Sequence, residues 1–245
     1  MKAPRIKAFS LHLAISALIA LVVIGLVFFI WYPAPLHTAV GVTQIFLILL
    51  AVDVVLGPLL TLLVYKVGKK TLVMDLTVIA VLQVAALGYG LFTVAEGRAA
   101  WLVFAADRFD LVRILDIDER KLDQAAEQYR KPSLLGPQWV AAVSPTDSSE
   151  KSDILLESVF AGVDIAQRPN LYQPLDSQKE AIQQRLLELS ALPPINTAES
   201  IKAVLAKHPS ADAWLPLHTS NQDMVVLMRK DTAEVVAIVD LRPWN

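Results

Sequence analysis

The chain has 245 residues, with 22 basic against 24 acidic side chains, a formal net charge of −2 and no cysteine. This balance argues against a nucleic-acid-binding protein, and the lack of cysteine excludes disulfides, thiolate metal sites and a cysteine nucleophile. Hydrophobic residues make up 55% of the chain and are concentrated before residue 97. The composition therefore predicts a membrane region followed by a soluble domain.

The first apolar segment covers residues 9–32 and follows a basic start that holds Lys2, Arg5 and Lys7. A signal peptide also begins with basic residues, but its apolar core spans only roughly 7–15 residues. This segment is longer than such a core. It therefore predicts an uncleaved first transmembrane helix.

Two further apolar runs, at residues 42–65 and 72–95, flank a short turn. A hydrocarbon core about 30 Å thick needs roughly 20 residues of helix to cross it. Each run is long enough, so the pair predicts a transmembrane helical hairpin. We therefore place a three-helix membrane region at residues 1–97.

The basic residues orient these helices. Three of them precede the first helix and three lie in the hairpin turn, whereas the loop between the first two helices holds no Lys or Arg. The positive-inside rule then places the N-terminus and the turn in the cytoplasm. Three crossings leave residues 98–245 outside, which in a Gram-negative cell means a periplasmic domain on the inner membrane.

Polar residues interrupt the middle of the hairpin. Asp53 lies about half-way along its first helix and Gln83 about half-way along its second, so an antiparallel hairpin places them at similar depth. An ionisable group in hydrocarbon is costly and usually faces protein or water. The pair predicts helix packing or the docking of a partner helix, with proton or ion movement as the alternative. Gly57 and Pro58 follow one turn later and predict a kink, or a bend that shapes a groove.

Residues 98–245 predict one α+β domain. Short apolar runs predict strands, and amphipathic stretches with capping residues predict helices. The expected strands are 100–105, 111–115, 138–143, 224–228 and 234–240. The expected helices are 118–129, 148–160, 177–189 and 197–207. Helix 148–160 should turn four residues inward, Ile154, Leu155, Ser158 and Val159, and helix 177–189 should begin with a capping box of Ser177 and Glu180.

The domain offers no constellation for chemistry. Asp107 and Arg108, with Asp110 close by, follow the first strand and predict a local structural or surface ion pair rather than an acid–base pair. The four histidines are scattered and lack the spacing of a helical zinc pair. The sequence therefore predicts no catalytic, cofactor or metal site.

Six segments carry a resemblance to a known family, and together they extend over essentially the whole chain. They combine the intramembrane Asp and Gln with the Gly-Pro pair and the DRF sequence. The segments are KAFSLHL (7–13), FFIWYPAP (28–35), VDVVLGPLLTLLVYK (52–66), DLTVIAVLQVAALGYG (75–90), VFAADRF (103–109) and VAIVDLRPW (236–244). In these segments the chain resembles the type IV pilin accessory proteins, the TfpX/TfpZ family.

The resemblance implies an inner-membrane factor that aids the assembly or dynamics of a type IV pilus. It implies the cognate major pilin as partner, with other pilus assembly proteins as further partners, and it implies no enzyme activity and no cofactor. Two alternatives stay open at this point. One is a small proton- or ion-coupled transporter that uses Asp53, and the other is a periplasmic enzyme that modifies pilin.

Overall fold

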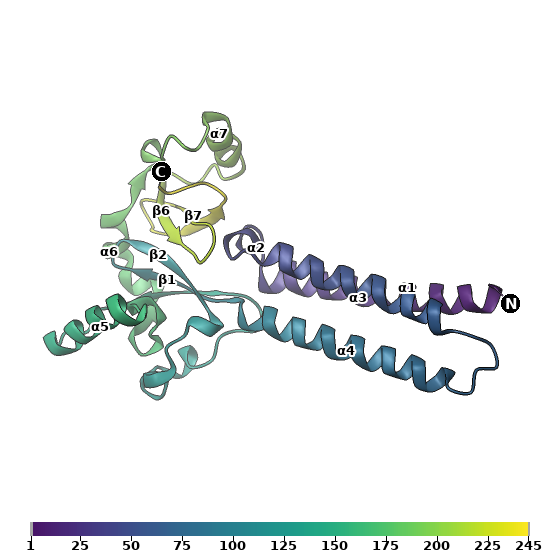
Figure 1. The fold of residues 1–245 in the computed structure, drawn as a ribbon. Coiled ribbons are helices and arrows are strands. Elements are labelled where there is room, and N and C mark those ends of the chain that lie inside the picture. The colour runs from purple at the N-terminus through teal and green to yellow at the C-terminus, as the bar shows by residue number, and fades with distance from the viewer. Residues whose placement is uncertain (1, 245) are drawn as a thin grey trace.

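Figure 1 shows long helices that project from one side of a domain built around a β-sheet. This computed structural model describes residues 2–244. Within that range, three helices are long and apolar enough to cross a membrane, Ala3–Trp31, Val42–Val64 and Leu72–Glu96. The predicted fold class, three N-terminal membrane helices followed by an α+β domain, is confirmed.

The first helix starts earlier than the sequence predicted. Helix α1 spans Lys2–Gly25 and continues as a π-helix, Leu26–Trp31, whereas the expected start was near residue 9. The basic beginning is helical because it packs against the end of another helix. Arg5 donates hydrogen bonds to the carbonyls of Leu62 and Leu63, which lie in the last turn of helix α3, where carbonyls lack partners within the helix.

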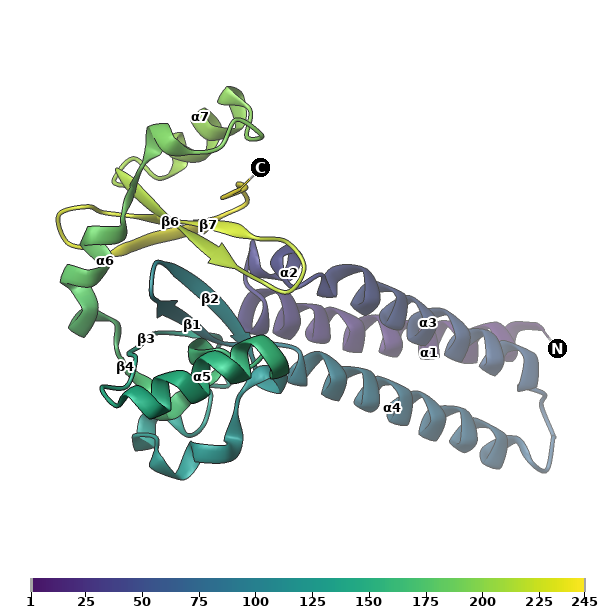
Figure 2. The ribbon, with the colours of Figure 1, turned by 60° about the vertical axis from the view of Figure 1, so that its left-hand side comes forward.

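Helix α3, Val42–Val64, lies between α1 and helix α4, Leu72–Glu96. The three helices share an apolar cluster near the outer domain, with Val27, Phe46 and Val94 among its buried members. Towards the hairpin turn, α4 diverges from the other two helices in both views (Figures 1 and 2). Helices α1 and α3 thus stay in contact up to the turn end of the bundle, whereas α4 diverges from them.

In the described part of the chain, one mixed sheet contains eight strands. Its order is β4-β3-β1-β2-β6-β7-β8, with β5 paired to β6. The pairs β1–β3 and β2–β6 are parallel and the others are antiparallel. The strands are β1 Ala99–Ala105, β2 Arg108–Arg113, β3 Gln138–Ala142, β4 Tyr172–Pro174, β5 Leu187–Glu188, β6 Ala213–His218, β7 Met224–Met228 and β8 Val235–Val239.

Four further α-helices lie outside the membrane bundle. They are α2 Leu36–Ala39, α5 Ser148–Ala161, α6 Lys179–Arg185 and α7 Ala198–Lys207. Helices α5 and α7 lie at opposite ends of the outer domain (Figure 2). Short 3-10 segments make most of the remaining connections. These are Ile114–Asp116, Glu119–Gln124, Glu127–Tyr129, Ile165–Gln167, Pro169–Leu171, Leu175–Gln178 and Leu189–Ala191.

Helix α2 belongs to the core of the outer domain, although it lies in the loop between the first two membrane helices. Leu36 and Ala39 are buried with residues of β1, β2, β6 and β7 in one apolar cluster. The carbonyl of Ala39 accepts hydrogen bonds from Thr219 Oγ1 at 2.8 Å and from the backbone N–H groups of Asn221 and Gln222 at 3.2 and 3.1 Å. The β6–β7 loop thus fastens the sheet to the membrane bundle.

Of the predicted helices, the one at residues 118–129 is wrong and the one at residues 177–189 is too long. Residues 118–129 form two 3-10 segments, because Lys121 has a non-helical φ of −119° and the Asp118 side chain accepts from the N–H of Arg120. The helix expected at 177–189 is limited to α6. Its expected capping box is absent, since Ser177 Oγ donates to the carbonyl of Pro174 instead.

Helix α5 has the predicted span but not the predicted inner face. Ile154 is buried, whereas the side chains of Leu155 and Val159 are 66% and 71% exposed. The helix is held at one side by ion pairs rather than by a broad apolar stripe, as described below. Its amphipathic pattern predicted the helix correctly and its burial incorrectly.

Candidate partner-binding site

The structure brings Asp53 and Gln83 together at the middle of the membrane hairpin. Gln83 Nε2 donates to the backbone carbonyl of Asp53 at 3.0 Å and lies 3.4 Å from Asp53 Oδ1. Both side chains are half-buried. Gln83 Oε1 is buried and has no hydrogen-bond partner among residues 2–244. The amide NH₂ group therefore links α3 to α4, while the amide oxygen of Gln83 stays without a partner in this described part of the chain.

Gly57 makes room for this amide. A Cβ atom built at Gly57 would lie 2.0 Å from Gln83 Nε2, so a larger residue would displace the side chain of Gln83. Pro58 follows inside α3, and the helix continues through it to Val64. Because proline has no N–H, the carbonyl of Val54 loses its usual donor. Gly57 and Pro58, both buried, thus shape the part of α3 that faces Gln83.

A second polar contact lies on the same side of α3, and the sequence reasoning missed it. Thr61 is buried, and its Oγ1 lies 2.6 Å from Nδ1 of His12 on α1. Asp53, Gly57 and Thr61 are spaced four residues apart, so they share one helix face. The four-residue spacing of these three residues in the sequence could have indicated that Thr61 lies on the same face as Asp53. We call His12, Asp53, Thr61 and Gln83 the polar seam of the bundle.

The end of the first membrane helix is fixed to the outer domain. Tyr32 donates its hydroxyl hydrogen to the carbonyl of Val94 at 2.7 Å. Arg98 is buried, donates to the carbonyl of Ser133 at 3.0 Å, and lies 5.8 Å from the ring centre of Trp31. These contacts hold the ends of the first and third helices together at the base of the sheet.

A cavity of about 1220 Å³ lies at this junction. Its volume exceeds the roughly 300–1,000 Å³ typical of small-molecule pockets. Phe29, whose side chain is 80% exposed, and Ile30 form one wall at the end of the first membrane helix. We call this space the junction cavity. The sheet residues that line it are Leu102, Trp139, Pro174, Val235, Val236, Ala237 and Ile238.

The ion pair expected after the first strand forms with a different carboxylate. Arg108 Nε donates to Asp110 Oδ1 at 3.1 Å, both on β2, whereas Asp107 makes no ion pair with any residue in the described range. Burial raises the pKa of Asp110, an effect that the Arg108 charge opposes. The pair is therefore local and structural, but its acid is Asp110 rather than Asp107.

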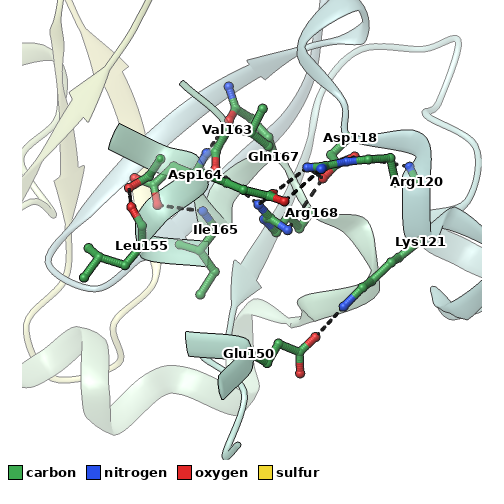
Figure 3. Close-up of polar contacts among 12 residues, drawn as sticks. Asp118, Arg120, Lys121, Glu150, Leu155, Val163, Asp164, Ile165, Gln167 and Arg168 are labelled. Atoms are coloured by element: carbon green, nitrogen blue, oxygen red, sulfur yellow. Dashed lines mark hydrogen bonds and ion pairs between the residues drawn. The ribbon is translucent and has the colours of Figure 1, made fainter. Parts of the chain in front are cut away.

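A larger ionic cluster attaches α5 to the rest of the domain (Figure 3). Arg120 makes two hydrogen bonds to Asp118 at 2.8 Å and two to Glu157 at 2.9 and 2.6 Å. Arg168, which is buried, also donates to Glu157. The Arg120 and Arg168 contacts lower the pKa of Glu157 to about 2. Lys121 adds a bond to Glu150 at 2.7 Å.

The C-terminal Arg242-Pro243-Trp244 segment fastens the last strand to the β6–β7 loop. Arg242 donates to the carbonyl of Asp223, and Trp244 Nε1 donates to Asp223 Oδ2 at 2.6 Å. Among residues 2–244, no group of three or more His, Asp or Glu side chains could hold a metal ion. The polar seam and the junction cavity are the two features considered below for the binding of another molecule.

The comparisons with known proteins agree on one family. The profile of fimbrial assembly protein FimB matches residues 2–41. A fimbrial assembly protein of Dichelobacter nodosus serogroup I is 29% identical over 246 residues, which cover 95% of this chain and 93% of the relative. The serogroup E1 protein of the same species is 32% identical over 178 residues, 72% of this chain and 69% of the relative. No solved structure matches the chain.

Proposed function

The chain belongs to the FimB family of fimbrial assembly proteins, and from this we propose that it is a membrane-bound assembly factor that binds the subunit of a type IV pilus. It acts by binding rather than by catalysis. The family membership supplies the process. The choice of the subunit as partner rests on the site.

The junction cavity carries the proposal. One wall is the last turn of a membrane helix and the other is the inner side of the sheet, so an occupant has to lie where the membrane ends. A protein with one membrane helix and a head outside fits such a place, because its chain passes this level as it leaves the lipid. Below the cavity, α4 diverges from the other two helices towards the hairpin turn (Figure 1), and a helix of the subunit would dock beside the polar seam on this side of the bundle.

The orientation is part of the proposal. The N-terminus and the Lys66–Lys70 turn residues lie at one end of the bundle, and the sheet domain lies at the other. The positive-inside rule supports a cytoplasmic position for the basic end. The sheet domain then lies in the periplasm, and the chain resides in the inner membrane.

Fusions of a reporter that is active only in the periplasm test this orientation. A reporter fused after Lys70 should be silent, and one fused after residue 245 should be active. The opposite pattern would overturn the proposed orientation, and contact with a subunit head outside the membrane would fall with it.

Photo-crosslinking in fimbriated cells tests the partner. A crosslinking residue at Phe29, in the cavity wall, and one at Val52, an exposed neighbour of Asp53 on α3, should each capture the fimbrial subunit, identified by mass spectrometry. Phe160 on α5 is the matched control, since its side chain is 84% exposed and that of Phe29 is 80% exposed. Absence of the subunit from the Phe29 and Val52 products, at normal protein level, would reject the proposal.

A further inference from the structure

Strand β8 has an open edge. It stands last in the sheet order and pairs with β7 alone. Among the described residues, no other backbone group hydrogen-bonds to Val235, Val236, Ala237 or Ile238. The outward N–H and C=O groups of this strand are thus available to a further strand.

Strand β8 has one irregularity, at Val236, where its register with β7 shifts, but it has no proline or charge that would block pairing. Exposed edges commonly carry proline, lysine or inward-pointing charge. Strand β8 reads VVAIV and contains none of these, and the charged residues Glu234 and Asp240 lie just beyond its ends. The side chains of its first four residues are half-buried, so the edge is apolar without being covered.

Both edges of the sheet reach the same cavity. The junction cavity is lined by Pro174 of β4, the strand at the opposite edge, and by four consecutive residues of β8. The sheet therefore curls so far that its two edges face one space. An added strand beside β8 would fill that space and narrow the gap towards β4.

We propose that β8 accepts an extended segment of the fimbrial subunit as an added strand within the junction cavity. This inference rests on the proposed function and specifies how the partner is held. Backbone groups of β8 supply hydrogen bonds, and the walls of the cavity, which carry both apolar and charged side chains, take alternate side chains of the guest, as in other cases of strand addition. Phe29 and Ile30 form one wall, so the guest segment is one that lies immediately outside the membrane.

A register scan tests the mode of binding. Crosslinking residues are placed singly at Val235, Val236, Ala237 and Ile238 in the full chain, in fimbriated cells. Strand addition predicts that the crosslinked position on the subunit moves by about one residue for each step along β8. A docked helix would instead give contacts spaced three or four residues apart. A helical pattern, or capture of a second copy of this chain, would overturn the inference.

A blocking variant gives an independent readout. Ala237→Lys places a charge on the edge and should abolish the β8 crosslinks and fimbriation while the Val52 crosslink persists. Ala203→Lys, on the exposed side of α7, is the matched control and should leave both unchanged. If Ala237→Lys lowers protein level, the register scan decides alone. A Val52 crosslink with no β8 crosslink leaves the proposed function standing and rejects strand addition; loss of both in the unmodified chain rejects both.

Discussion

At the scale of single residues, one contact between helices α3 and α4 requires a glycine. Gln83 reaches across to Asp53 only because Gly57 has no side chain at that point. Hydrocarbon offers no hydrogen-bond partner, so the Gln83 amide takes its partner from α3. Polar contacts of this kind link membrane helices. Gly57 therefore matters for the space it leaves rather than for its backbone freedom.

We expect Gly57→Ala to displace the Gln83 amide and leave polar groups without partners, at a cost of about 1–3 kcal/mol. Gly88→Ala is the control, because a Cβ atom there meets nothing within 4 Å and alanine favours the helix. Unfolding of the full chain in detergent measures both. In a Gln83→Ala background the obstruction is gone, so Gly57→Ala should no longer destabilise. Persistence of the effect in that background would contradict this account.

Two substitutions of Asp53 distinguish a packing or docking role of the polar seam from a role in proton or ion movement. Asp53→Asn keeps the shape and hydrogen bonding of the side chain but cannot ionise. Asp53→Leu can neither form hydrogen bonds nor ionise. If the seam serves packing or partner docking, Asp53→Asn should retain fimbriae on the cell surface and Asp53→Leu should reduce them. Fimbriae are counted at matched protein level. Equal failure of both variants would instead support proton or ion movement through Asp53.

At the scale of elements, α5 is attached to its domain mainly by charge. Its apolar residues Leu155 and Val159 are exposed, and Glu157 provides the link to Arg120 and Arg168. An amphipathic pattern in the sequence does not distinguish a helix that packs by its apolar face from one held by its polar face. Attachment by carboxylates also makes the position of the helix sensitive to acid.

We expect the Glu157 contribution to stability to be complete above about pH 5 and to decline on acidification. The folded pKa of about 2 lies below the roughly 4.3 of an unfolded glutamate. The stabilisation is therefore lost as pH falls from about 4.3 towards 2. Denaturation midpoints of the full chain between pH 6 and 2.5 measure this loss.

Two variants control this prediction. Glu157→Gln should lower the midpoint at pH 6 and remove part of the dependence on pH below 4.5. Glu199→Gln, at an exposed position on α7 that forms no ion pair among the described residues, should do neither. A midpoint for Glu157→Gln that falls with acid as steeply as that of the unchanged chain would show that other carboxylates dominate.

At the scale of the whole molecule, membrane region and outer domain share a core. The long apolar runs were sufficient to predict the membrane helices, because 20 apolar residues have few other uses. The role of α2 could not be predicted, since Leu36 and Ala39 pack on strands β1, β2, β6 and β7, all of which lie far along the chain. Helix α7 was predicted from local signals, which depend only on neighbouring residues, and Thr197 caps it.

The order of the strands in the sheet likewise could not be predicted from signals between neighbouring residues. Strand β6 was not predicted because it contains Pro216, and proline usually argues against an interior strand. Its parallel pairing with β2, in which Asp110 lies opposite His218, joins distant segments. The membrane pair Asp53 and Gln83 could be predicted because one short turn sets its register. The junction cavity could not, because it depends on how the two ends of the sheet meet.

We expect Leu36→Ala in the full chain to destabilise the outer domain by about 2–5 kcal/mol, the usual range for a buried leucine. Leu36 is 2% exposed within the core cluster. Leu134→Ala, at a side chain that is 71% exposed, is the control and should have little effect. Chemical denaturation followed by tryptophan fluorescence measures both. Equal stability of the two variants would show that the domain core does not need α2.

The position of α2 also connects membrane insertion to quality control during synthesis. The ribosome makes residues 36–39 long before it makes some of the partners that receive them, Met224 and Val226 among others. If helix α4 fails to cross the membrane, α2 and the sheet are left on opposite sides of it, because only α3 then crosses between them. The sheet then lacks part of its interior and exposes apolar surface, which marks a protein for degradation. An error in topology thereby becomes an error in folding, and a misinserted chain is removed before it reaches a growing fimbria.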